Sequence, residues 1–210
     1  FDFCSPISDF FDYKGLYSIA YEDGEYVYVT RINPDTLEKV KTIKIKKLYP
    51  LLGGVTCDSK GNYYIGWGQE DTNEKKDMVT FAISKYNYKG KFIKSALSYG
   101  NENGTKKPFE FGNLSMAFDG DILVASYARL GYKSDDGLNH QSSTGFSVNT
   151  NTMEPVSDLI GNHTSHSFSQ RVISIKNGGV ALADLGDSGP RGMLISFLDT
   201  NFYPQLPTPF

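Results

Sequence analysis

The sequence predicts an all-β protein built from four repeats of a four-stranded antiparallel meander. Aromatic side chains make up 14% of its 210 residues, and aromatic residues favour strands over helices. Short apolar runs are separated by tight turns that hold Asp or Asn together with Gly, which is a strong signal for a β-hairpin. This pattern returns four times, and its turn glycines Gly15, Gly61, Gly120 and Gly178 lie 46, 59 and 58 residues apart.

Each repeat consists of two consecutive hairpins. The first hairpins cover residues 10–19, 55–65, 116–124 and 172–182. The turns of the second hairpins begin at Asn33, Asn87, Asn149 and Asp199. We therefore expect a single repeat domain over residues 1–210, with repeats at about 4–47, 51–98, 112–158 and 165–201 and a Pro-rich tail at 202–210.

The lysine-rich segment 39–47 is expected to be the outer strand of the first repeat, because no stretch of the chain shows a helical period. Its apolar residues Val40, Ile43 and Ile45 change parity, which predicts a β-bulge. Lysines on an outermost strand discourage pairing with another sheet edge. The alternative is that these lysines form a patch for an anionic ligand.

Meander repeats of this period resemble the blades of the β-propeller superfamily. The resemblance covers nearly the whole chain and rests on repeat pattern and turn chemistry, since the WD dipeptide, the kelch double glycine and the Asp box are absent. Residues 165–171 followed by 184–191 resemble a pairing in uncharacterised secreted microbial propeller proteins. That resemblance implies an extracellular or cell-surface location and no particular activity.

The fourth repeat has no segment that suits an outer strand. After Asn201 the chain carries Pro204, Pro207 and Pro209, and proline cannot donate to a strand ladder. We therefore expect four blades of a larger propeller, with further blades outside this chain, or a four-bladed ring that closes irregularly. A β-sandwich is the competing fold, because its short strands and turns look similar in sequence.

Function is expected at one end of the strands. In a meander the two tight turns of a repeat share one end, and the central loops and the links between repeats share the other. The long loops, at residues 68–78, 97–112, 130–143, 158–165 and 184–191, all fall in the second set. All three histidines of the chain lie there as well. Long loops on a rigid scaffold are common places for binding sites.

The leading hypothesis is a non-enzymatic module that presents this loop end to a glycan or a protein partner. The expected ligand-binding residues are polar side chains that can hydrogen-bond a ligand and one flat ring that can pack on it. They are His140, His166, Arg171, Asp187, Arg191 and Trp67. The structural alternatives are a His166 ring that satisfies backbone groups, a Gly/Pro loop held by an ion pair, and ring packing between adjacent sheets.

Two other functions remain open. A polysaccharide hydrolase or lyase would use Asp184 or Asp187 as acid or base with His166 assisting, although the sequence holds no G-x-S-x-G elbow, P-loop or dinucleotide motif. A purely structural repeat of a larger assembly is the third possibility. No cofactor is expected. The metal alternatives are zinc at His163, His166 and Asp187 and calcium at the acidic loops.

The remaining composition excludes some partners. A formal net charge of −3 gives no electrostatic case for nucleic acid, and no apolar run is long enough to span a bilayer. Cys4 and Cys57 are expected to be small buried residues or, alternatively, a disulfide. Three sequons begin at Asn103, Asn113 and Asn162 and would matter only in a eukaryotic secretory pathway.

Overall fold

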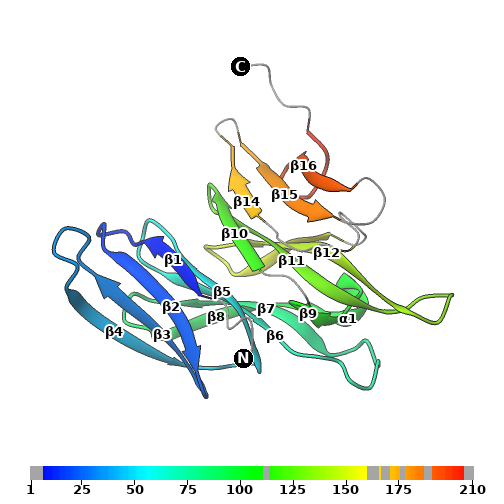
Figure 1. The fold of residues 1–210 in the computed structure, drawn as a ribbon, viewed down its shortest axis with the longest axis horizontal. Helices are drawn as coiled ribbons and strands as arrows, with labels where there is room; N and C mark the ends of the chain where they lie inside the picture. Colours follow the sequence, from blue (N-terminus) through cyan, green and yellow to red (C-terminus); the bar gives the residue numbers. More distant parts are fainter. Residues whose placement is uncertain are drawn as a thin grey trace. The chain divides into compact units, whose positions relative to one another are not determined.

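The computed structural model describes residues 7–110, 114–159, 166, 171–175, 178–186 and 191–205. These residues form four antiparallel sheets and one short helix (Figure 1), so the predicted all-β class is confirmed. The strand orders are β1-β2-β3-β4, β5-β6-β7-β8, β10-β11-β12-β13 with β9 added beside β11, and β14-β15-β16. The structure therefore has four separate meanders, whereas a β-sandwich, the competing prediction, would have two packed sheets.

The elements follow the repeat order of the sequence. The first two sheets contain β1 (Ser8–Phe11), β2 (Tyr17–Asp23), β3 (Tyr26–Ile32), β4 (Lys39–Lys46), β5 (Leu51–Cys57), β6 (Tyr63–Gly68), β7 (Val79–Tyr86) and β8 (Phe92–Tyr99). The other two contain β9 (Thr105–Pro108), β10 (Leu114–Asp119), β11 (Ile122–Lys133), β12 (Asn139–Asn149), β13 (Glu154–Leu159), β14 (Arg171–Ser174), β15 (Val180–Gly186) and β16 (Gly192–Leu198). The helix is α1 (Gly100–Asn103).

The chain divides into two compact units, which we describe separately. Unit 1 comprises residues 1–68 and 83–95, and unit 2 comprises residues 69–82 and 96–210. Within unit 1, β1 packs beside β5, and the Val55 amide donates a hydrogen bond to Ser8 Oγ at 2.9 Å. Within unit 2, β10 packs beside β14, and the Val172 amide donates to Ser115 Oγ, also at 2.9 Å. The same link therefore joins the first strands of two neighbouring sheets in each unit, which is the arrangement expected of adjacent propeller blades.

The second turn of every repeat is fixed by one side chain. Asn33, Asn87, Asn149 and Asp199 each accept, at Oδ1, a hydrogen bond from the amide two residues ahead, at 2.8–2.9 Å. A side-chain oxygen in this position mimics a backbone turn. The four turn positions predicted from the sequence are confirmed, and the side-chain oxygen that Asn and Asp share explains them.

The third sheet departs from the expected loop pattern. Residues 130–143 were expected to form a long loop, but β11 continues to Lys133 and β12 begins at Asn139, so a short turn joins two long strands. The expected loop at 97–112 contains α1 and β9, and β9 pairs with β11. Helix α1 is a single turn of four residues, which is too short to produce a detectable hydrophobic period.

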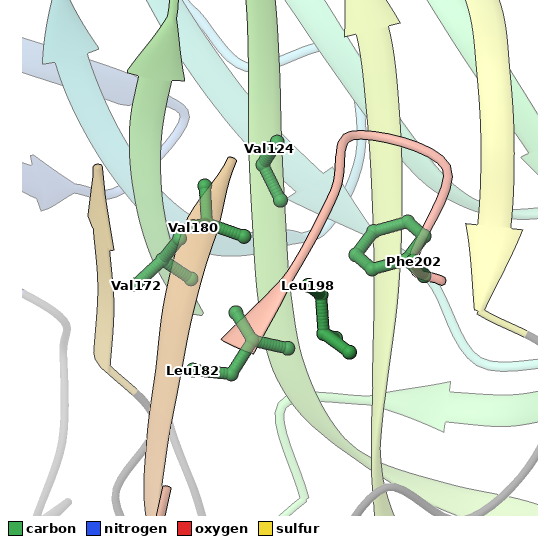
Figure 2. Close-up of a cluster of buried hydrophobic side chains, with 6 residues drawn as sticks. All are labelled: Val124, Val172, Val180, Leu182, Leu198 and Phe202. Carbon is green, nitrogen blue, oxygen red and sulfur yellow. The ribbon is translucent and has the colours of Figure 1, made fainter. Parts of the chain in front are cut away.

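The core of unit 2 includes a cluster of aliphatic side chains from the third and fourth sheets and one phenylalanine that follows β16 (Figure 2). Its buried members are Val124, Val172, Val180, Leu182, Leu198 and Phe202. In the part of the chain that the structure describes, the fourth sheet has three strands, followed by a single bridge between Leu198 and Pro204. The expectation that the fourth repeat lacks a regular outer strand is thus consistent with the structure.

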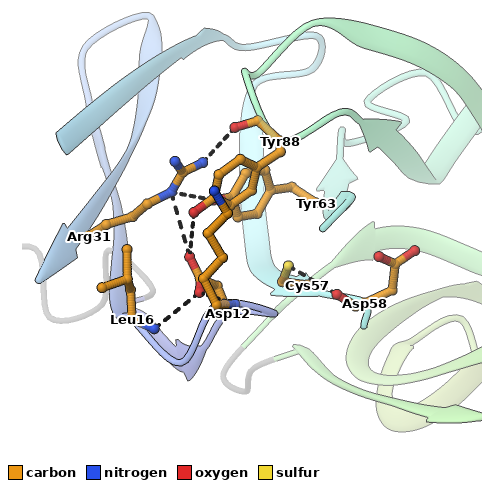
Figure 3. A network of polar contacts seen from close by, with 8 residues as sticks. Asp12, Leu16, Arg31, Cys57, Asp58, Tyr63 and Tyr88 are labelled. Atoms are coloured by element: carbon orange, nitrogen blue, oxygen red, sulfur yellow. Dashed lines mark hydrogen bonds and ion pairs between the residues drawn. The ribbon is translucent and has the colours of Figure 1, made fainter. Parts of the chain in front are cut away.

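The core of unit 1 contains a buried ion pair at the first turn (Figure 3). Arg31 Nε lies 3.7 Å from Asp12 Oδ2 and donates to Tyr63 Oη at 2.8 Å. The Arg31 guanidinium also lies over the Tyr88 ring, 3.4 Å from its centroid, and the Tyr88 hydroxyl donates to Asp12 Oδ2 at 3.0 Å. Burial and this bond raise the pKa of Tyr88 to about 12. The Asp12 carboxylate also accepts hydrogen bonds from the Lys14 and Leu16 amides, so the cluster joins the first turn to Arg31 and Tyr88.

Cys57 is a free thiol, and Cys4 lies outside the described residues. Cys57 Sγ donates to the Asp58 carbonyl at 3.3 Å, and burial raises the pKa of the Cys57 thiol to about 12. A thiol in this state is a poor nucleophile and metal ligand. Across the described ranges, no helix is long and apolar enough to cross a membrane.

Candidate functional site

The candidate site is a pocket of about 370 Å³ in unit 2. It is formed by the ends of β11 and β12, by α1, and by the loop between β6 and β7. Its lining residues are Lys76, Gly100, Asn101, Gly104, Arg129, Gly131, Tyr132, Lys133, Ser134, His140 and Ser142. Three of these are Lys or Arg and none is Asp or Glu, in a chain whose formal net charge is −3.

Arg129 is the central cation of the pocket. It lies on β11 opposite Ser142 of β12, and its side chain is buried, since the residue is only 8% exposed. Nε donates to Ser142 Oγ at 2.9 Å, and Nη1 donates to the Asn103 carbonyl at 2.6 Å. Both acceptors are neutral, and no described carboxylate forms an ion pair with Arg129. Burial lowers the pKa of Arg129, but an arginine stays protonated in proteins.

Two glycines of the α1 segment allow pocket side chains to approach. A Cβ at Gly104 would lie 2.4 Å from Arg129 Nη1, and a Cβ at Gly100 would lie 2.0 Å from the Tyr132 hydroxyl. Gly104 also has a φ of 66°, in the left-handed conformation that closes a helix. A side chain at either position would therefore force the Arg129 guanidinium or the Tyr132 ring to move.

A buried carboxylate holds the opposite wall. Asp71 is 1% exposed, and its Oδ2 accepts hydrogen bonds from the Tyr132 hydroxyl at 2.9 Å and the Lys76 amide at 2.8 Å. Burial opposes ionisation of Asp71, but the bonds from Lys76 and Tyr132 outweigh it and lower the pKa of Asp71. Burial and the bond to Asp71 raise the pKa of Tyr132. Asp71 thus fixes the loop backbone at Lys76 and the ring of Tyr132.

His140 is at the rim of the pocket, where its Nε2 lies 2.8 Å from Asp136 Oδ2. The two side chains are about half exposed. Hydrogen bonds from the Ser134 hydroxyl, the Leu138 amide and His140 lower the pKa of Asp136 to about 2. Asp136 is therefore ionised at neutral pH and already engaged by these groups. The rim contributes an imidazole whose Nε2 is held by a carboxylate.

The chemistry of this pocket favours an anion. Lys76, Arg129 and Lys133 supply positive charge, and Asn101, Ser134 and Ser142 supply polar groups that can bind a hydroxylated ligand. Within the described lining, His140 has the type of side chain that most often serves as a general acid or base. Among the described residues, no group of three or more His, Cys, Asp or Glu side chains could hold a metal ion.

Of the six expected ligand-binding residues, five lie in the described part of the chain, and among these five only His140 lines the pocket. His166 lies beside the same strand, and its amide donates to the Gln141 carbonyl at 3.3 Å. Arg171 and Arg191 are exposed residues of unit 2 that do not line the pocket. Trp67 belongs to unit 1 and is fully buried, so it presents no surface to a ligand.

The residues expected for catalysis or metal binding are only partly described. Asp184 is 4% exposed, and its Oδ1 accepts a hydrogen bond from the Leu185 amide at 2.7 Å. Arg171 lies opposite Ala183, next to Asp184 in sequence. Asp187 and His163 lie outside the described residues, and so do Asn113 and Asn162 of the sequons. Asn103, the remaining sequon residue, is fully buried and donates to Ser98 Oγ at 2.7 Å, which leaves no room for a glycan.

Sequence reasoning missed most of the pocket, including Arg129, Lys76, Tyr132 and Lys133. One signal was available. Arg129 follows the apolar run 122–128 in the same strand, and a charge at the end of a buried strand needs a partner or a function. Residues 130–143 were expected to form a loop, and a charged residue next to a loop is normally exposed. Arg129 was therefore not recognised as a buried charge.

Comparison with known proteins supports the fold and leaves function open. The sequence matches no protein-family model and no curated protein. Hydrazine synthase from Kuenenia stuttgartiensis matches the structure at 13% identity and a TM-score of 0.53, over 90% of this chain and 49% of that chain. A protein of unknown function from Bacteroides caccae matches at 13% identity and a TM-score of 0.53, over 92% and 63%. This chain therefore spans less than two thirds of the length of each of these two proteins. Likeness at such identity shows the fold alone, and the chain folds as four blades of a β-propeller.

Proposed function

We propose that the chain is a binding module on a propeller scaffold, and that the pocket at Arg129 takes a small carboxylate-bearing ligand of the size of one acidic sugar residue. The observation that carries this proposal is Arg129 itself, a buried cation with two neutral acceptors and no acidic partner among the described residues. An unpaired buried charge costs free energy. A ligand carboxylate at the guanidinium would remove that cost through charge-assisted hydrogen bonds.

The rest of the lining supports a hydroxylated acid over a bare ion. The volume of about 370 Å³ is near the lower end of the range for small-molecule pockets, roughly 300–1,000 Å³. Asn101, Ser134 and Ser142 give neutral hydrogen-bonding groups around the cations. The Tyr132 ring, with Lys76 Nζ 5.2 Å from its centroid, adds an aromatic wall. A uronic acid offers one carboxylate and several hydroxyls to such a site.

The test is a thermal-shift titration of the purified chain with glucuronate and galacturonate, and with glucose and galactose as neutral counterparts. A ligand that binds only the folded state raises the melting temperature by mass action. We expect a concentration-dependent increase with the two uronates and none with the two neutral sugars. Equal shifts with acidic and neutral sugars, or no shift with any of the four, would overturn the proposal.

Variants then locate the binding. Lys133→Gln removes a cation from the pocket without changing its buried parts, and Arg129→Lys keeps the charge but loses the planar fork of donors. Both should reduce the uronate-induced shift. Lys89→Gln, at an exposed turn of unit 1, removes the same charge elsewhere and should leave that shift unchanged. If Lys89→Gln weakens binding as much as Lys133→Gln does, the effect is one of net charge and the pocket is not the site.

A further inference from the structure

The first sheet, β1-β2-β3-β4 of unit 1, has two faces of opposite character. One face is buried and carries Ser18, Ala20, Val27, Val29, Ile43 and Ile45. The other face is partly or fully exposed and is dominated by tyrosine and lysine. We call it the tyrosine–lysine face and define it by Tyr21, Tyr26, Tyr28, Lys39, Lys44 and Lys46.

The strand register brings these six residues onto one surface. Tyr21 pairs with Tyr28, and Tyr28 pairs with Lys44, so the three form one row across β2, β3 and β4. Tyr26 pairs with Lys46 in the next row. A register shift between Arg31 and Ile32 then returns Lys39 to the same side, opposite Ile32.

The bulge places the charge of Lys39 on the same face as those of Lys44 and Lys46. In a regular strand Lys39 would point to the opposite face from Lys44 and Lys46, because side chains alternate. With the bulge, the three lysines line one side of the sheet over about 20 Å, because their partners Tyr26 and Ile32 are separated by six steps of roughly 3.3 Å. The described acidic residues of this face are Asp23, opposite Tyr26, and Asp9 of β1, opposite Ile19.

The ring geometry limits which polyanion can bind. Tyr21 and Tyr28 stack on each other, with centroids 5.5 Å apart and planes 17° from parallel. Lys44 Nζ lies 3.6 Å from the Tyr26 centroid and 5.7 Å from the Tyr28 centroid. Ring faces engaged by another ring or an ammonium group are closed to a nucleobase, which binds protein by stacking on an open ring. Hydroxyl and ammonium donors remain available.

We propose that the tyrosine–lysine face binds a linear acidic polysaccharide. The lysine ammonium groups would contact its carboxylates, and the tyrosine hydroxyl groups would hydrogen-bond its sugar hydroxyls. The inference is independent of the Arg129 pocket, because it concerns unit 1 and a polymer that spans several sugar residues. A further β-sheet is a poorer occupant, because covering the lysine row would take its charges out of water.

The experiment measures binding of the full chain to polygalacturonate by isothermal titration calorimetry, with dextran as the neutral polymer. We expect binding to polygalacturonate only, and a decrease of about tenfold in affinity between 50 and 300 mM NaCl, because exposed charges are screened by salt. The double variant Lys44→Gln/Lys46→Gln should weaken binding by about fivefold or more if each lysine contributes roughly 0.5 kcal/mol.

Matched variants separate this proposal from the pocket and from charge alone. Lys89→Gln/Lys91→Gln removes two exposed charges of the same unit and should leave polymer binding unchanged. Lys133→Gln should also leave it unchanged, while Lys44→Gln/Lys46→Gln should preserve the thermal shift with free uronates. The proposal is overturned if dextran binds equally, if both double variants lose affinity alike, or if oligo(dT) binds more tightly than polygalacturonate. The last outcome would reassign the face to single-stranded nucleic acid.

Discussion

Gly104 and Arg129 are packed so closely that a Cβ on residue 104 would lie 2.4 Å from Arg129 Nη1. The two residues come from different elements, the end of α1 and the interior of β11. Their contact lets the guanidinium reach the Asn103 carbonyl and keeps it at the pocket. The orientation of the main cation therefore depends on the absence of a side chain at residue 104.

Gly104→Ala should displace the Arg129 guanidinium and reduce the thermal shift caused by uronates. The matched control is Gly120→Ala. Gly120 also has a positive φ, 57°, but a Cβ there would meet no atom within 4 Å. Both variants should lose about 1 kcal/mol of stability from the left-handed backbone alone, and only Gly104→Ala should lose ligand binding. Equal ligand responses in the two variants would contradict this role for Gly104.

Arg31→Met should strongly destabilise the protein. The substitution leaves the buried Asp12 carboxylate without its cation, and breaking a buried ion pair typically costs about 3–5 kcal/mol. Urea denaturation of the whole chain, followed by tyrosine fluorescence, measures the change. Asp12→Asn/Arg31→Met should be less destabilised than the sum of the two single variants, since both charges are then removed. Strictly additive losses would show that the pair has no coupling energy.

Phe202→Ala should destabilise unit 2 by roughly 3 kcal/mol or more, because it opens a cavity in the cluster drawn in Figure 2. Phe202 packs against Gly145 of β12, where an added Cβ would lie 2.7 Å from the Phe202 ring. The neighbouring residue Tyr203 is 69% exposed, so Tyr203→Ala is the control and should change stability by less than about 0.5 kcal/mol. Equal losses in thermal denaturation would argue against this packing role.

Asp158→Asn should make stability less dependent on pH. Burial, opposed by the hydrogen bond from Ser98 and assisted by Glu102, raises the pKa of Asp158 to about 6. The folded state then binds more protons than the unfolded state between about pH 4 and pH 6, so this group's contribution to stability falls as pH rises through that window. We expect Asp158→Asn to be more stable than the native protein at pH 7.5, by on the order of 1 kcal/mol, and to match it near pH 4. The raised pKa of Asp158 would be contradicted if the variant and the native protein differed in free energy of unfolding by the same amount at pH 7.5 and near pH 4.

The fold was predictable because its signals are local. Asn33, Asn87, Asn149 and Asp199 each fix a turn through a hydrogen bond to an amide two residues away, so a short window of sequence contains the whole interaction. The bulge in β4 was predicted for the same reason, from the changing parity of Val40, Ile43 and Ile45. These features need no knowledge of distant parts of the chain.

The candidate site was much less predictable because its contacts join distant segments. Tyr132 meets Asp71 across 61 positions of sequence, and Arg129 meets Asn103 across 26. Neither Tyr132 nor Arg129 belongs to a recognisable sequence motif. His140 was expected because it was assigned to a long loop over residues 130–143, whereas the structure places it in β12, beside a short turn. Trp67 is a residue type that often contacts ligands, but its complete burial makes it a core residue. Burial depends on packing that a single sequence does not specify.

The hydrogen bond that each turn Asn or Asp accepts from the amide two residues ahead also bears on how such a chain can diverge. Because strand register at one end is set within five residues, the opposite ends can exchange side chains and change length while the ladders stay aligned. A library that varies residues 72–77 and 134–140 while keeping Asn87 and Asn149 would therefore sample new ligand specificities on an unchanged framework. The end of the strands that carries the Asn and Asp turns maintains the fold, and the opposite end of the same strands can vary its side chains.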